Sequence, residues 1–143
     1  MSQLTFEILP PIKLPLVSRL YKAHYPSGKA KKDELTAVAY QESKMVAVVR
    51  FRSIEQFRLL TGMLVIPEFR EQGVGHKLMH YCQQQILKEG DFCFAYEHLE
   101  AFYAQHSFVS VEPQQLPNSL QMLFERYVRS GKKLVAMKHS QPL

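Results

Sequence analysis

The segment Met63–Leu78 combines residue types suited to binding a phosphate group. An apolar run ends at Pro67, and a short polar turn that carries Arg70, Gly73 and Gly75 leads into a stretch with helical spacing. A helix N-terminus presents backbone N–H groups that have no acceptor within the helix, and it carries partial positive charge. Glycine has no Cβ, so an anion can approach its backbone closely. The pattern therefore predicts a phosphorylated small-molecule ligand.

Spacing narrows the kind of phosphate site. A P-loop requires Gly, four residues and Gly-Lys-Ser/Thr, and that string is absent from the sequence. A dinucleotide fingerprint requires a third glycine, and Leu78 occupies that position. The pattern that fits is Arg/Gln-x-x-Gly-x-Gly/Ala, read from Arg70 to Gly75. A bare Gly-x-Gly more often marks a turn that binds nothing, but Val65-x-Pro67 before it and the helix after it favour a ligand.

Together, Val65-Ile66-Pro67 and Arg70–Gly75 resemble the signature of the GNAT superfamily of N-acetyltransferases. In that family the turn holds the pyrophosphate of acetyl-coenzyme A, so the resemblance implies acetyl-CoA as co-substrate. It also implies that strand backbone pairs with the pantetheine arm, while turn N–H groups bind the pyrophosphate. The residues so implied are Met63, Leu64, Val65, Arg70, Gln72, Gly73, Val74, Gly75, His76 and Lys77.

A second resemblance concerns the segment Phe102–Phe108, which is similar to the family's Tyr-x-x-x-Gly-Phe pattern. It implies that Tyr103 is the general acid that protonates the departing thiolate. A thiol has a pKa of about 8.5 and a phenol about 10, so the tyrosine must be well placed to donate. Taken alone, Tyr103 reads as a half-buried aromatic residue. The chain departs from the family at Ser107, where glycine is usual, and at Tyr96, where many members have asparagine.

The general base and any metal are less clearly marked. A primary amine is mostly protonated at neutral pH, so an acceptor for its proton is needed. Glu55 and Glu97 flank two expected strands, and His98 and His24 are further candidates, but each also reads as a plain surface residue. His76 and His80 have helical metal-ligand spacing, yet a zinc protease motif would need glutamate where Lys77 stands. We predict no metal site.

Hydrophobic periodicity predicts alternating strands and helices. Strands are expected over residues 4–9, 35–40, 45–51, 57–66, 91–96, 108–111 and 134–138. Helices are expected over residues 13–25, from Val74 to a stop at Gly90, 97–106 and 119–130. Gly62 inside an apolar strand indicates a bulge or a close approach by a ligand.

The expected fold class is α/β (α+β). The resemblance implies a mixed, mostly antiparallel sheet of six or seven strands, helices on both faces and a splayed cofactor cleft. The chain departs from the family layout at the expected helix 119–130, because the family's last two strands are commonly joined directly.

Size and composition set the remaining bounds. The 143 residues are expected to form one GNAT-like acetyltransferase domain, 1–143, and the apolar share of 46% is ordinary for a globular protein. No apolar stretch is long enough to span a membrane, and no secretory leader is evident, so we expect a cytoplasmic protein. Cys82 and Cys93 lie on predicted buried elements, which favours free thiols over a disulfide. The net charge of +5 owes much to Lys29–Lys32, which we interpret as a solvated loop.

The leading hypothesis is an N-acetyltransferase that moves the acetyl group of acetyl-CoA directly to an amine within a ternary complex. The acceptor is a small-molecule amine or a protein amine, and the sequence does not decide between them. One alternative is a non-catalytic acyl-CoA binding or sensing module on the same fold, to which Ser107 and Tyr96 give some weight. Another is a basic nucleic-acid binding domain, although Lys29–Lys32 lacks interleaved aromatic residues, so no nucleic-acid partner is predicted. Because family members often dimerise, a homodimer is one of the states left open.

Overall fold

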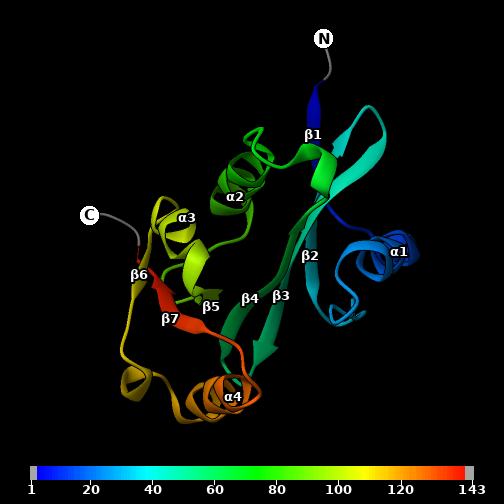
Figure 1. Cartoon of the computed structure of the whole chain (residues 1–143). Helices are drawn as coiled ribbons and strands as arrows, with labels where there is room; N and C mark the ends of the chain where they lie inside the picture. The colour runs from blue at the N-terminus through cyan, green and yellow to red at the C-terminus, as the bar shows by residue number, and fades with distance from the viewer. Residues whose placement is uncertain (1–2, 141–143) are drawn as a thin grey trace. The chain divides into compact units, whose positions relative to one another are not determined.

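A computed structural model describes residues 3–140 (Figure 1). The strands are β1 (Leu4–Ile8), β2 (Leu35–Gln41), β3 (Lys44–Ile54), β4 (Phe57–Val65), β5 (Phe92–Tyr96), β6 (Phe108–Ser110) and β7 (Leu134–His139). The α-helices are α1 (Leu14–His24), α2 (Val74–Gln85), α3 (Glu100–Ala104) and α4 (Asn118–Arg129). No helix in the described part of the chain is both long enough and apolar enough to cross a bilayer.

The seven strands form one sheet in the order β1-β2-β3-β4-β5-β7-β6. The pairs β1/β2, β2/β3, β5/β7 and β6/β7 are antiparallel, and β4/β5 is parallel. The parallel ladder registers Leu59 with Phe92 and Leu60 with Cys93. Seven strands and a mostly antiparallel sheet confirm the predicted fold class, whereas the predicted cofactor cleft stays a prediction.

The chain divides into two compact units. The first runs up to Arg52 and resumes at Thr61–Ile86, and the second consists of Ser53–Leu60 and the chain from Leu87 onward. Strand β4 changes unit between Leu60 and Thr61. The expectation of one domain over residues 1–143 stays a prediction.

In the first unit, helices α1 and α2 lie on opposite sides of the strands (Figure 1). The buried residues of α1, Val17 and Tyr21, are four positions apart and therefore lie on one face of the helix. This face packs into an apolar cluster. Their partners in this cluster are Leu9, Val38, Val48 and Leu64. Helix α2 buries Val74, Leu78, Met79 and Cys82. Burial of these faces fixes both ends of the Met63–Leu78 segment.

In the second unit, helix α4 buries Leu120, Leu123 and Phe124. Their spacing of three to four residues makes one apolar face, which packs with Leu59, Phe92, Leu116 and Ala136. The polypeptide passes from β6 through α4 to β7, so the predicted helix between the last two strands is confirmed. Strand β7 then inserts between β5 and β6 in the sheet.

The main correction concerns the end of helix α2. The sequence predicts a stop at Gly90, but the helix ends at Gln85 and Ile86 leaves helical geometry with φ −131°. Ile86 and Leu87 are both 5% exposed, so burying two consecutive apolar side chains replaces the last helical turn. Gly90 does turn the chain, with φ +91°, and Lys88 N–H donates to Asp91 Oδ2 at 2.9 Å.

Candidate active site

The predicted phosphate turn forms the start of helix α2. After β4, a single 3₁₀ turn covers Pro67–Phe69, and the helix begins at Val74 with Gly73 as its N-cap residue. Gly73 has φ +80°, a left-handed conformation that glycine adopts without steric cost. A Cβ built on Gly73 would meet no atom within 4 Å. The backbone therefore reaches open space at the place where the resemblance puts a pyrophosphate.

The N-terminus of α2 is not capped by a side chain of its own N-cap residue. Its first turn contains no acidic residue. The first intrahelical hydrogen bond runs from Lys77 N–H to Gly73 O at 3.0 Å, so the N–H groups of Val74 and Gly75 have no acceptor inside the helix. These donors and the helix dipole together suit a phosphate.

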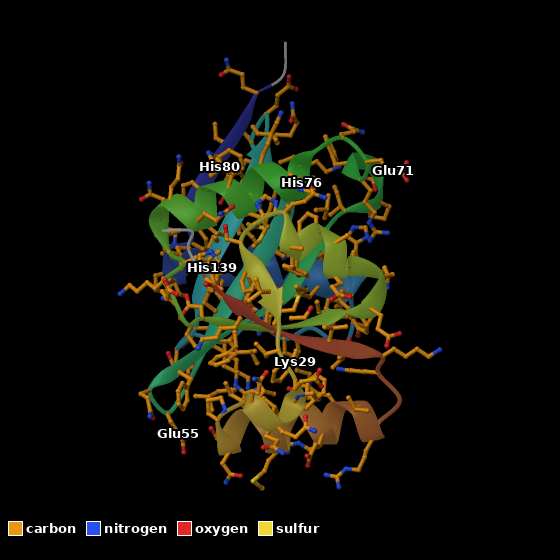
Figure 2. All side chains as sticks on the ribbon, turned by 90° about the vertical axis from the view of Figure 1, so that its left-hand side faces the viewer. Lys29, Glu55, Glu71, His76, His80 and His139 are labelled. Carbon is orange, nitrogen blue, oxygen red and sulfur yellow. The ribbon has the colours of Figure 1, made fainter. Side chains whose placement is uncertain are left out.

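The side chains of the turn brace its backbone. Arg70 Nε donates to Val65 O at 2.9 Å, and Gln72 Nε2 donates to Glu68 O at 2.9 Å. Arg70 therefore links the turn to the end of β4, and one nitrogen of its guanidinium group is already hydrogen-bonded there. Glu71, which lies on the same turn (Figure 2), also has a left-handed φ of +63°.

The strand segment predicted to bind the pantetheine arm offers backbone more than side chain. Leu64 is 6% exposed and packs in the core of the first unit. Met63 and Val65, which flank it, are half-buried. Strand side chains point alternately to the two faces of the sheet. A ligand that lies along the edge of this segment would therefore meet main-chain N–H and C=O groups, as the resemblance implies.

His76 and Lys77 are exposed on α2, with His80 one turn further on (Figure 2). They border a surface groove on the first unit, lined by Phe6, His76, Lys77, His80, Tyr81 and Gln84. The Phe6 and Tyr81 rings stack there with centroids 5.4 Å apart. Among residues 3–140, no three His, Cys, Asp or Glu side chains gather as a metal site would require.

The predicted general acid Tyr103 lies on α3 and is 4% exposed. Its ring makes edge contacts with Phe102 and Phe108, at 5.1 and 5.8 Å between centroids. Its hydroxyl hydrogen-bonds the thiol of Cys93. Burial raises the pKa of that thiol, and the hydrogen bond from Tyr103 lowers it by less. Cys93 is therefore a neutral partner that orients the phenol.

The two departures from the family pattern have distinct geometries. Ser107 adopts φ +69°, so the backbone has the left-handed conformation that glycine would favour, and serine is held in it. Tyr96 precedes the 3₁₀ turn Glu97–Leu99 as its N-cap residue, and its ring stacks on that of His98 at 5.9 Å.

The two carboxylates proposed as base lie in unlike settings. Glu55 accepts a hydrogen bond from Ser119 Oγ at 2.8 Å, at the start of α4. It precedes β4, so the whole strand separates it from the turn that follows Val65. Glu97 is exposed just past β5. The assignment of the base stays a prediction for both.

A polar network around Gly62 was missed at the sequence level. Tyr21 Oη donates to Gly62 O at 2.6 Å, and Arg50 Nε donates to Tyr21 Oη at 3.1 Å. The signals available were Gly62 inside an apolar run and Arg50 inside another, since a charged residue on a buried strand needs a partner. The close approach predicted at Gly62 is made by side chains of the chain itself.

A family model for the acetyltransferase (GNAT) domain matches residues 17–124, which is more than half of the chain. The match spans the turn, the Met63–Val65 segment and Tyr103. No curated protein sequence matches the chain.

Solved structures of similar fold include one synthase and two N-acetyltransferases. N-acetylglutamate synthase from Neisseria gonorrhoeae, complexed with coenzyme A and N-acetyl-glutamate, has a TM-score of 0.74 and 10% identity; the match covers 96% of this chain and 35% of that one. The ribosomal-protein-S18-alanine N-acetyltransferase from Escherichia coli has a TM-score of 0.67 and 15% identity, with coverages of 99% and 97%. The PaiA N-acetyltransferase from Thermoplasma acidophilum, in complex with coenzyme A, has a TM-score of 0.64 and 11% identity, with coverages of 97% and 99%.

The chain thus spans about a third of the length of the synthase and nearly all of the other two enzymes. At these identities the likeness concerns the fold, and the match to the family model carries the assignment. On that match, this chain belongs to the GNAT family of acetyltransferases.

Proposed function

We propose that the protein transfers an acetyl group from acetyl-CoA to a primary amine by direct attack within a ternary complex. The observation that carries this proposal is the uncapped start of α2, where Gly73 has left-handed geometry and its Cβ position faces open space. Within a chain of this family, such a helix start suits the pyrophosphate of the co-substrate. The fold neighbours solved with coenzyme A support acyl-CoA as the donor class.

Each part of the chemistry has a candidate group. The backbone of Met63–Val65 orients the pantetheine arm and thioester, and backbone N–H groups at the start of α2 bind the pyrophosphate. Arg70 and Lys77 add positive charge beside it. The amine, freed of its proton by a base such as Glu97, attacks the thioester carbonyl carbon. The C–S bond of the tetrahedral intermediate then breaks, and Tyr103 donates its proton to the departing thiolate.

Direct transfer is favoured over a covalent acyl-enzyme because both cysteines are buried. Cys82 and Cys93 are 0% and 1% exposed, and burial raises the pKa of the Cys82 thiol to about 12, so neither is an accessible thiolate. We expect protein incubated with acetyl-CoA alone to keep its unmodified mass in mass spectrometry. A stable acetyl adduct on either thiol would contradict direct transfer.

The co-substrate site is tested by Gly73→Glu. The new carboxylate would fill the open space and repel a pyrophosphate, so we expect CoA affinity in titration calorimetry to fall at least about 100-fold. Gly131→Glu is the matched control, because Gly131 also has a left-handed φ, +105°, and an open Cβ position, after α4. It carries the same charge and similar strain, and we expect it to bind CoA like the unaltered protein. Equal affinities in all three proteins would overturn the site.

A further inference from the structure

Strand β4 contains a residue in left-handed conformation just before the segment proposed to hold the pantetheine arm. Gly62 has φ +66°, whereas strand residues have φ near −120 to −140°. Such a residue interrupts the pleat and redirects the N–H and C=O groups that follow it. The next three residues are Met63, Leu64 and Val65. The conformation of Gly62 therefore sets the direction of their backbone groups.

Gly62 is held from another element of the first unit. Its carbonyl oxygen accepts a hydrogen bond from Tyr21 Oη at 2.6 Å, and Tyr21 Oη accepts one from Arg50 Nε at 3.1 Å. Tyr21 is 1% exposed, and burial raises the pKa of its phenol to about 12. The phenol is therefore neutral at physiological pH and keeps the proton that it donates to Gly62.

Arg50 is fixed in turn by a buried ion pair. Its Nη1 lies 2.7 Å from Glu34 Oε1, and the two side chains are 8% and 4% exposed. Nη1 also donates to the backbone carbonyl of Lys29. Two buried charges are costly unless they are paired and hydrogen-bonded, so the guanidinium group has little freedom to move away from Tyr21.

The space around Gly62 is filled by this network. A Cβ built on Gly62 would lie 2.5 Å from Tyr21 Oη and 2.7 Å from Arg50 Nε. Any other residue at position 62 would push both groups away and would also be strained at a positive φ. Glycine is thus required here by two side chains of the protein, independently of any ligand.

We propose that Tyr21 is a positioning residue for acyl-CoA: its hydroxyl, held by Arg50 and Glu34, fixes Gly62 so that the Met63–Val65 backbone is aligned with the pantetheine arm. The inference rests on the proposed function. It assigns a role in the co-substrate site to α1 and to the loop containing Lys29 and Glu34, which contribute no group to the phosphate turn.

The test is Tyr21→Phe, which removes the hydroxyl and keeps the ring that packs in the apolar cluster. Two probes separate the arm from the phosphates: CoA, and 3′-phosphoadenosine 5′-diphosphate, which contains the pyrophosphate and lacks the pantetheine arm. We expect the variant to bind CoA about 10-fold more weakly, because Gly62 O loses its buried donor. Binding of the shorter probe should change less than about two-fold.

The matched control is Tyr40→Phe. Tyr40 Oη donates to Glu7 Oε2 at 2.7 Å in the same unit, so this variant also loses a tyrosine hydrogen bond. We expect it to bind both probes like the unaltered protein. A second variant, Glu34→Gln, removes the charge that holds Arg50 and should weaken CoA binding in the same direction as Tyr21→Phe. Amide hydrogen exchange should become faster at Met63–Val65 in Tyr21→Phe and stay unchanged there in Tyr40→Phe.

The outcomes separate this inference from the proposed function. If the unaltered protein binds CoA and Tyr21→Phe binds it within two-fold of that affinity, Tyr21 has no positioning role. Equal weakening of both probes would indicate a general structural defect and would also overturn the inference. If the unaltered protein binds neither probe, the proposed co-substrate site itself is wrong.

Discussion

Tyr103, which we propose as the general acid, is held in place by its neighbours. Its ring is fixed by Phe102 and Phe108, and its hydroxyl hydrogen-bonds Cys93. A thiol is a weak hydrogen-bond partner, so the phenol can exchange it for a coenzyme thiolate at little cost. The interaction with Cys93 keeps the hydroxyl oriented.

Tyr103→Phe therefore tests the general acid. We expect kcat for CoA release, measured with an amine identified by screening, to fall about 100-fold, since general acid catalysis contributes at least that factor. The affinity for CoA should stay within about two-fold, because the hydroxyl acts on the leaving thiolate. Tyr127→Phe, which alters a half-buried tyrosine of the second unit, should leave kcat unchanged. An unaltered kcat in Tyr103→Phe would show that the proton comes from another source.

The start of helix α2 at Val74 was predictable at the residue level. The polar turn with Gly73 and the apolar spacing that follows it are both local in sequence. Tyr21 was not predictable, because its partner Gly62 is 41 residues away and the hydrogen bond exists only after folding. The hydrogen bond between Ser119 and Glu55 was not predictable either, because the two residues are 64 positions apart in sequence.

At the scale of elements, hydrophobic periodicity predicted every α-helix and strand of the described chain to within a few residues. The exception is the end of α2, because tertiary burial of Ile86 and Leu87 overrides the local stop signal at Gly90. The position of β7 between β5 and β6 was beyond the sequence, since strand order depends on contacts that no local pattern encodes.

The turn that joins α3 to β6 gives a prediction at this scale. Ser107 has φ +69°, which costs a residue with a Cβ roughly 1–2 kcal/mol. Glycine would remove that strain. Its greater conformational freedom in the unfolded chain would lower stability by about 0.5–1 kcal/mol. We expect Ser107→Gly to raise the midpoint of thermal unfolding by about 2–4 °C.

Ser130→Gly is the control for that substitution. Ser130 has φ −76° at the end of α4, and its Oγ donates to Tyr127 O at 2.7 Å. Glycine there removes a hydrogen bond and relieves no strain, so the unfolding midpoint should fall. A lower midpoint in Ser107→Gly would show that the serine side chain stabilises the turn by more than its backbone strain costs.

For the molecule as a whole, the residues proposed for acetyl transfer are distributed over the two compact units. The phosphate turn, Met63–Val65 and the Tyr21 network belong to the first unit, and Tyr103 with Cys93 belongs to the second. The family assignment covers both, because the matched region runs from residue 17 to residue 124. A ligand that binds only the folded protein raises its free energy of unfolding by mass action.

The most direct test of the central claim is thermal unfolding of the protein with acetyl-CoA, CoA, ATP and NAD measured in parallel. A ligand present at 100 times its dissociation constant adds roughly 2.7 kcal/mol to the free energy of unfolding. For a chain of this size, that stabilisation raises the midpoint on the order of 5–10 °C. We predict such a shift with acetyl-CoA and with CoA, and none with ATP or NAD. If neither acetyl-CoA nor CoA shifts the midpoint, the assignment of the Gly73 turn as an acyl-CoA site is contradicted.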